Sequence, residues 1–138
     1  HLSYAYYAAK DGNFKMFRFI MDFSKEHSFE ERTQESGRMR SKYPDRIPCL
    51  ISKHSDGSEI PSIDKTKFLV PNDFTVGQLM WVVRKRIKLK SEQSLFLFCG
   101  YGNIPASSAI MKNIDKEHIN KDGFLYFTYS GENTFGWS

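Results

Sequence analysis

The sequence lacks several features that would assign it to a class at once. None of its apolar runs reaches the ~20 residues that a membrane-spanning helix needs. The N-terminus lacks the basic, apolar and small-residue order of a secretory signal. Any attachment to a membrane is therefore expected to come from a chemical modification or from a partner. The chain also contains no internal repeat and no low-complexity tract.

Cysteine is scarce, with two residues in 138, and both Cys49 and Cys99 lie within apolar, strand-like runs. We interpret them as reduced core residues of a cytosolic protein. A thiol enzyme is the alternative, although neither cysteine has a histidine near it in the sequence, and unreactive thiols would exclude it. His27, His54 and His118 do not have the spacing of metal ligands, so neither a metal site nor a cofactor is expected.

Neither positive nor negative charge dominates the chain, whose formal net charge is +4, but the charges are distributed unevenly along it. Residues 32–90 hold 13 Lys/Arg and 6 Asp/Glu, whereas residues 91–138 hold 3 and 5. A basic face of this kind can attract acidic peptides, anionic lipid or nucleic acid. The triplet Arg84-Lys85-Arg86 is typical of a nuclear signal or a nucleic-acid patch. Because no stacking aromatics are interleaved with it, nucleic acid is not the expected partner.

The residues that are present predict helices and strands in a clear order. Ser28 to Glu31 and Thr75 to Gln78 both have the spacing of a capping box, which opens a helix. The predicted helices cover residues 28–42, 76–87 and, as a short turn, 110–114; the predicted strands cover 47–51, 67–70, 95–99 and 124–129. Pro48 suggests that one side of the first strand lacks a ladder partner at that position.

This order predicts a single α+β domain. A hairpin, a crossover helix and two further strands can close one mixed sheet with the helix across a face, which is the ubiquitin-like β-grasp, here with additional N-terminal helices. Residues 1–21 are expected to be an N-terminal extension, and a natural start at Met21 would make it non-native. Residues 22–130 form the expected domain and 131–138 a flexible C-terminal tail.

Several spaced motifs resemble one known family. They are Tyr43-Pro44-Asp45-Arg46-Ile47-Pro48, Asp64 to Pro71, Thr75 to Gln78, Arg84 to Ile87, Phe124-Leu125-Tyr126, and Tyr129 to Glu132 followed by Phe135-Gly136. In this order they resemble the ubiquitin-like autophagy modifiers, the family of the GABA-A-receptor-associated protein and the microtubule-associated light-chain proteins. The resemblance covers residues 22–138 and leaves residues 1–20 outside.

The resemblance implies a fate for the tail. Members of the family are cut after a glycine by a dedicated cysteine protease and then joined through that glycine to phosphatidylethanolamine by activating and conjugating enzymes. Here Gly136 would be that glycine, and Trp137 would begin the discarded piece. Glycine suits the position because it has no side chain to crowd the carbonyl that is attacked. Taken without the resemblance, a terminal Phe-Gly is a weak motif that fits a flexible end equally well.

The resemblance also implies a groove that captures short peptides with an aromatic-x-x-aliphatic motif as an added strand. By position, the aromatic pocket would use Glu35, Met39, Pro48, Leu50, Lys67, Leu69 and Phe124, and the aliphatic pocket Phe68, Val70, Pro71, Phe74, Leu79 and Val82. Arg46, Lys65 and Lys67 would meet acidic residues that flank the motif. The plain alternatives are core packing for the alternating strand residues and ordinary edge-strand lysines.

Together these implications predict a ubiquitin-like modifier and not an enzyme. It would recruit cargo receptors and adaptors to autophagosomal membranes, being cytoplasmic until it is joined to lipid. A β-grasp peptide-binding adaptor that is never conjugated is the alternative. Phe17 to Ile20 has the same aromatic-x-x-aliphatic spacing. We therefore expect this segment to add as a strand to such a groove on a neighbouring molecule, or else to be ordered by packing elsewhere.

Overall fold

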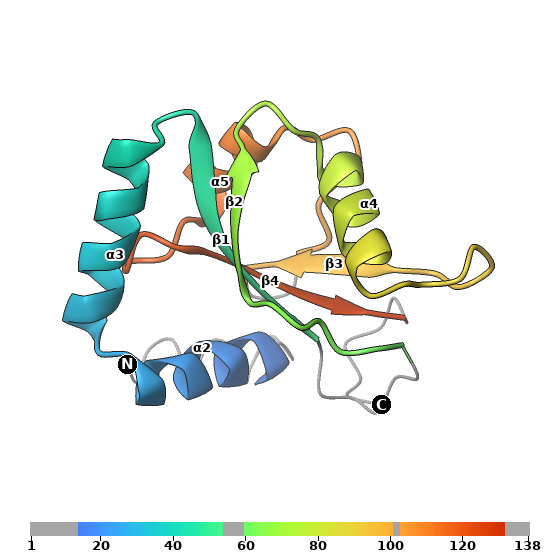
Figure 1. Ribbon diagram of the computed structural model, residues 1–138, viewed down its shortest axis with the longest axis horizontal. Coiled ribbons are helices and arrows are strands. Elements are labelled where there is room, and N and C mark those ends of the chain that lie inside the picture. Colours follow the sequence, from blue (N-terminus) through green and yellow to red (C-terminus); the bar gives the residue numbers. More distant parts are fainter. Residues whose placement is uncertain (1–13, 54–59, 101–102, 132–138) are drawn as a thin grey trace.

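The computed structural model describes residues 14–53, 60–100 and 103–131, which form one four-stranded sheet with helices on both of its faces (Figure 1). The helices are α2 (Phe14–Glu26), α3 (Phe29–Lys42), α4 (Val76–Arg86) and α5 (Met111–His118). The strands are β1 (Arg46–Lys53), β2 (Lys67–Pro71), β3 (Phe96–Cys99) and β4 (Leu125–Ser130). The predicted α+β β-grasp with N-terminal helices is confirmed.

The sheet has the strand order β2-β1-β4-β3, so its two central strands are the first and the last in the chain. β1 and β4 run parallel, with Cys49 opposite Leu125, and each has an antiparallel outer neighbour. Pro48 lies one residue before the ladder between β1 and β4 begins at Cys49. The missing N–H of this proline therefore stands where the β4 side of the strand has no partner yet.

Local capping chemistry sets the start of two helices. The Ser28 side chain accepts a hydrogen bond from the backbone N–H of Glu31, whose carboxylate accepts one in return from the Ser28 N–H. Thr75 and Gln78 form the same reciprocal pair ahead of α4. Both capping boxes are confirmed. The turn expected at residues 110–114 is longer than predicted, because α5 continues to His118.

Side chains alternate along the central strands and fill two separate cores. One face of the sheet packs against α4 and α5, with Ile51, Leu79, Val83, Met111 and Phe127 among the buried residues. The other face carries Leu50, Phe124 and Tyr126, which contact Met39 of α3 and the α2 residues Phe19, Ile20 and Phe23. We call this second set the α2-side cluster. None of the described helices is long and apolar enough to cross a membrane.

The extension expected at residues 1–21 does not end as a separate piece, because α2 runs without a break across the expected boundary at residue 21. Residues 17–20 are helical, so the prediction that they add to a groove as an extended strand is wrong. Ile20 packs on the sheet of its own chain in the α2-side cluster. The side chain of Phe17 lies outside the described residues. The apolar surface of the sheet, which is distant in sequence, explains why this segment folds back as a helix.

Candidate functional site

A hollow of about 410 Å³ opens beside the outer strand β2. Four segments line it: Met39 from α3, Pro48 and Cys49 from β1, Lys65, Lys67, Phe68 and Leu69 from β2 and the residues before it, and Phe124 from the start of β4. Five of the seven residues predicted for the aromatic pocket therefore lie together around one cavity. We call it the β2 hollow.

The strand beside this hollow has one open edge. β2 pairs with β1 from Lys67 to Pro71 and stands at the end of the strand order. An outer strand presents unpaired backbone N–H and C=O groups, to which an extended peptide can add. The hollow and the open edge thus occur on the same strand, which is the combination that strand-adding recognition requires.

Glu35 and Leu50 are near the hollow without lining it. The Lys67 Nζ forms an ion pair with the Glu35 carboxylate across the rim, where both side chains are partly exposed. Leu50 is fully buried in the α2-side cluster with Phe124, so it supports the cavity wall from behind. The family resemblance implied both residues for the aromatic pocket, whereas the depth of Leu50 depends on packing from α2.

Cationic side chains surround the rim. The Lys65 Nζ lies 5.3 Å from the centre of the Phe68 ring, and Arg46 Nη1 donates a hydrogen bond to the Leu69 carbonyl at 3.3 Å. The Arg46 and Lys65 side chains are exposed, whereas Lys67 is held by Glu35. Lys65 and Lys67 thus line the hollow, and Arg46 bonds to Leu69, another lining residue.

The residues predicted for the aliphatic pocket gather around the other core. Val70 and Leu79 are buried there, with exposed fractions of 4% and 1%, so they are packing residues in this structure. Phe68 and Phe74 are half-buried and pack against the same cluster. Pro71 and Val82 are half-buried as well. The four half-buried side chains are the part of this set that a ligand could touch.

The sequence analysis did not predict that α2 packs behind the β2 hollow. Phe23 meets the rings of Phe124 and Tyr126 edge-on, with centroid separations of 6.4 and 6.3 Å. Phe19 makes a similar contact with Tyr126 at 5.5 Å. Since Phe124 also lines the β2 hollow, α2 supports the site from the opposite side. The spacing of Phe19, Ile20 and Phe23 along one helical face was the available signal.

The two cysteines are buried and chemically quiet. Burial raises the pKa of Cys99 to about 12 and raises the pKa of Cys49 well above its ordinary value. Both thiols are free and protonated at neutral pH, whereas a nucleophilic cysteine acts as the thiolate. Gly136 and Trp137, the residues expected to carry cleavage and conjugation, lie outside the described residues.

Comparisons with known proteins agree on one family. A family model described as "Autophagy protein Atg8 ubiquitin like" matches residues 31–136. "Autophagy-related protein 8" of Mycosarcoma maydis is 55% identical over 114 residues, which are 83% of this chain and 95% of that protein. "Autophagy-related protein 8" of Schizosaccharomyces pombe is 54% identical over 114 residues, covering 83% and 93%. A crystal structure of Trypanosoma brucei ATG8 superimposes with a TM-score of 0.73 at 40% identity, covering 78% of this chain and 91% of that one.

Proposed function

Because this chain belongs to the Atg8 family of ubiquitin-like autophagy proteins, we propose that it is a modifier conjugated through its C-terminus that captures receptors in the β2 hollow. A processing cysteine protease cuts after Gly136. Activating and conjugating enzymes then join the Gly136 carboxyl to phosphatidylethanolamine. The protein is a substrate of these enzymes and not itself a catalyst. It is cytoplasmic before conjugation and resides on autophagosomal membranes afterwards.

The observation that carries the receptor role is the β2 hollow beside an open strand edge. Its volume of about 410 Å³ accommodates one aromatic side chain, and its walls include the apolar groups of Met39, Leu69 and Phe124. The half-buried Phe68 and Phe74 pack against the core on the α4 side of the sheet and offer the second, aliphatic contact. Exposed Arg46 and Lys65 complement acidic residues of the ligand.

A peptide titration tests the receptor role. The probe is a synthetic peptide with acidic residues ahead of an aromatic-x-x-aliphatic motif, and its binding is followed by calorimetry. Each buried anchor contributes about 1.5–3 kcal/mol, so the Phe68→Ala and Leu69→Ala double variant should weaken binding at least about tenfold. The matched control removes two exposed apolar side chains elsewhere, Ile104→Ala and Ile119→Ala, and should bind as the wild type does. Unchanged binding in a folded double variant would show that the β2 hollow does not bind the peptide.

Conjugation is tested on the tail. Gly136→Ala should retain the fold but block cleavage and lipid transfer, whereas Ser138→Ala, beyond the cut, should be processed normally. Intact mass of the protein recovered from cells reports both steps through the loss of Trp137-Ser138 and the added lipid. Normal processing of Gly136→Ala would refute the assignment. Peptide binding without any processing of the wild type would favour the adaptor that is never conjugated.

A further inference from the structure

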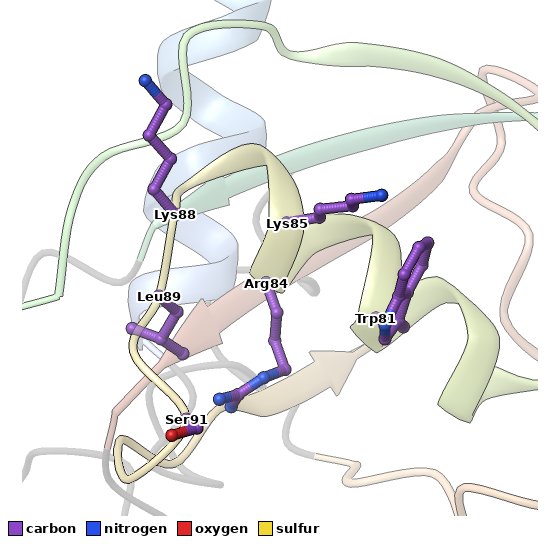
Figure 2. Close-up of a pocket in the computed structure, with 6 residues that line it drawn as sticks. All are labelled: Trp81, Arg84, Lys85, Lys88, Leu89 and Ser91. Atoms are coloured by element: carbon purple, nitrogen blue, oxygen red, sulfur yellow. The ribbon is translucent and has the colours of Figure 1, made fainter.

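An exposed tryptophan, Trp81, lies midway along α4. Trp81 has an exposed fraction of 59%, the largest among the big apolar side chains of the described residues. The Lys85 Nζ lies 4.5 Å from the centre of its ring, and Figure 2 shows this lysine extending toward it. Neither the β2 hollow nor the two cores use this tryptophan. The ring and the lysine thus form an exposed cation–π pair.

The loop after α4 folds back and builds a second hollow there. Arg84 donates to the carbonyl oxygens of Gln93 at 2.7 Å and Lys90 at 2.9 Å, and so ties the loop to the helix. Lys88 has a positive φ of 56°, which lets the chain turn just after the helix. The resulting cavity of about 380 Å³ is lined by Trp81, Arg84, Lys85, Lys88, Leu89 and Ser91 (Figure 2). We call this surface the α4-end face.

The α4-end face is strongly basic. From residue 74 to residue 91 the chain contains five Lys/Arg and no Asp/Glu. Arg86 is paired with Asp64 at 2.8 Å and Arg84 is held by loop carbonyls, which leaves Lys85, Lys88 and Lys90 exposed. Cations near a helix C-terminus stabilise the helix, which accounts for part of this charge. It does not account for the exposed ring, nor for Lys88 and Lys90, which follow the helix.

The α4-end face lies at the end of the molecule from which the tail departs. The tied loop leads directly into β3, and Phe96 at the start of β3 pairs with Ser130 at the end of β4. Figure 1 shows the last turn of α4 and the end of β4 toward the same end of the molecule. Gly136 is five positions beyond Gly131, and even a fully extended chain spans only about 17 Å over that length. A lipid joined at Gly136 would hold this end close to the bilayer.

We propose that the α4-end face docks on an anionic membrane surface and sets the orientation of the lipid-joined protein, an inference that rests on the proposed conjugation at Gly136. Tryptophan is favoured at the headgroup level of a bilayer because its ring is apolar and its N–H is polar. Lysines beside it gain from the negative surface potential of anionic lipid. An extended peptide would need a strand edge, and nucleic acid a series of stacking rings; this helix end offers neither.

Vesicle binding of the soluble, unconjugated chain tests the surface itself. In a Trp137→Phe background Trp81 is the only tryptophan, so its emission reports this face alone. Vesicles with about 30 mol% phosphatidylserine should shift the emission to shorter wavelength, and pure phosphatidylcholine vesicles should not. Each lysine near the surface contributes roughly fivefold, so Lys85→Gln with Lys88→Gln should weaken binding about thirtyfold. Salt at about 0.5 M should abolish it.

Matched variants separate this face from general charge. Lys112→Gln with Lys116→Gln removes two exposed lysines of α5 and should weaken binding by about twofold or less. Followed by co-sedimentation with vesicles, which does not need the ring as a reporter, Trp81→Phe should retain most of the binding and Trp81→Ser should lose it. Equal losses in the α4 and α5 pairs would overturn the proposal. So would an emission shift with soluble polyglutamate and none with anionic vesicles, because the face would then serve an acidic protein.

A chemically tethered protein separates this inference from the proposed function. Ser138→Cys is coupled to a maleimide-bearing lipid, while the buried Cys49 and Cys99 are protected by the fold. Brominated lipids should then quench Trp81 in the Trp137→Phe background, where it is the only tryptophan, and adding the Lys85→Gln and Lys88→Gln pair should reduce that quenching. Equal quenching in both would overturn the orientation. Failure of natural conjugation at Gly136 would leave this tethered measurement unaffected.

Discussion

At the residue scale, Asp122 is the most connected polar side chain in the interior. One carboxylate oxygen accepts hydrogen bonds from Arg32 Nη1 at 2.7 Å and from Tyr126 Oη at 2.6 Å; the other accepts one from the Phe124 N–H at 2.9 Å. Burial, reinforced by the Asp122 charge, raises the pKa of Tyr126, so its hydroxyl remains a donor. These bonds attach α3 to the segment that leads into β4.

Asp122→Ala should therefore be strongly destabilising. It leaves the Arg32 guanidinium, which is nearly buried, without its charge partner, and breaking a buried pair costs about 3–5 kcal/mol. Urea unfolding followed by circular dichroism measures the loss. Asp22→Ala, which breaks an exposed pair with Lys25 at 3.9 Å, should cost less than about 1 kcal/mol. Equal effects of the two variants would show that the buried network contributes little.

The hydroxyl of Thr128 is the opposite case. It is buried at the centre of the sheet and lacks a hydrogen-bond partner among the described residues. Thr128→Val keeps the branched shape and removes this unsatisfied group, so it should stabilise the protein by about 1 kcal/mol. Thr66→Val, at an exposed position, is the control and should change little. A measurable loss of stability in Thr128→Val would mean that the hydroxyl has a partner in solution.

At the scale of elements, a helix set by local contacts can be predicted from the sequence, whereas a helix that depends on packing with distant residues cannot. The starts of α3 and α4 were predictable because each is set within four residues by a reciprocal cap. α2 was not predictable by that route, since it rests on Leu50, Phe124 and Tyr126, which come from strands far along the chain. The apolar face of α2 can be buried only after the sheet has formed, because the sheet supplies the surface that covers it.

The β2 hollow follows the same logic. Its lining comes from α3, β1, β2 and the start of β4, and neither periodicity nor spacing brings Met39, Lys67 and Phe124 together. The resemblance to a known family did so, because it carries a tertiary arrangement with it. Even then Val70 and Leu79 were expected to line a pocket and are buried in the core. Depth within a layer depends on the fit of many side chains, which a motif does not encode.

Phe23→Ala should weaken both α2 and the site behind it. Phe23 is half-buried, so we expect a loss of about 2 kcal/mol, below the range for fully buried phenylalanines, together with reduced helical circular dichroism. Peptide affinity should fall as well, because Phe124 lies between α2 and the β2 hollow. Phe29→Ala, which removes a ring with an exposed fraction of 51%, is the matched control. Unchanged helicity in Phe23→Ala would contradict the packing of α2 on the sheet.

At the scale of the whole molecule, burial keeps four weak acids of the described residues in their neutral form. Burial raises the pKa values of Cys49, Cys99, Tyr126 and Tyr129, those of Cys99 and Tyr129 to about 12. The Tyr129 hydroxyl also donates to the Pro61 carbonyl at 2.7 Å. In the unfolded chain these groups lose their protons at lower pH than in the folded protein, so the folded state binds more protons under alkaline conditions.

Stability should therefore fall as the pH rises above about 9, where unfolded cysteines begin to ionise. Within the window between its unfolded and folded pKa, each such group costs about 1.4 kcal/mol per pH unit. Urea unfolding at a series of pH values measures the slope. Cys99→Ala removes one of the titrating groups. The free energy of unfolding should then fall less steeply with pH, by up to the contribution of one proton, whatever the effect of the substitution on stability at pH 7. A free energy of unfolding that stays constant up to about pH 11 would contradict these shifts.

The parallel pairing of β1 with β4 has a consequence for the protein while it is being made. A ribosome delivers β1 and β2 early, and this hairpin can close at once because its strands are neighbours. The backbone N–H and C=O groups on the inner edge of β1 stay unpaired until β4 is synthesised, because β4 is the last of the four sheet strands in the chain. During that interval the nascent chain carries an open, apolar strand edge, the kind of surface that mispairs with other chains and that chaperones shield.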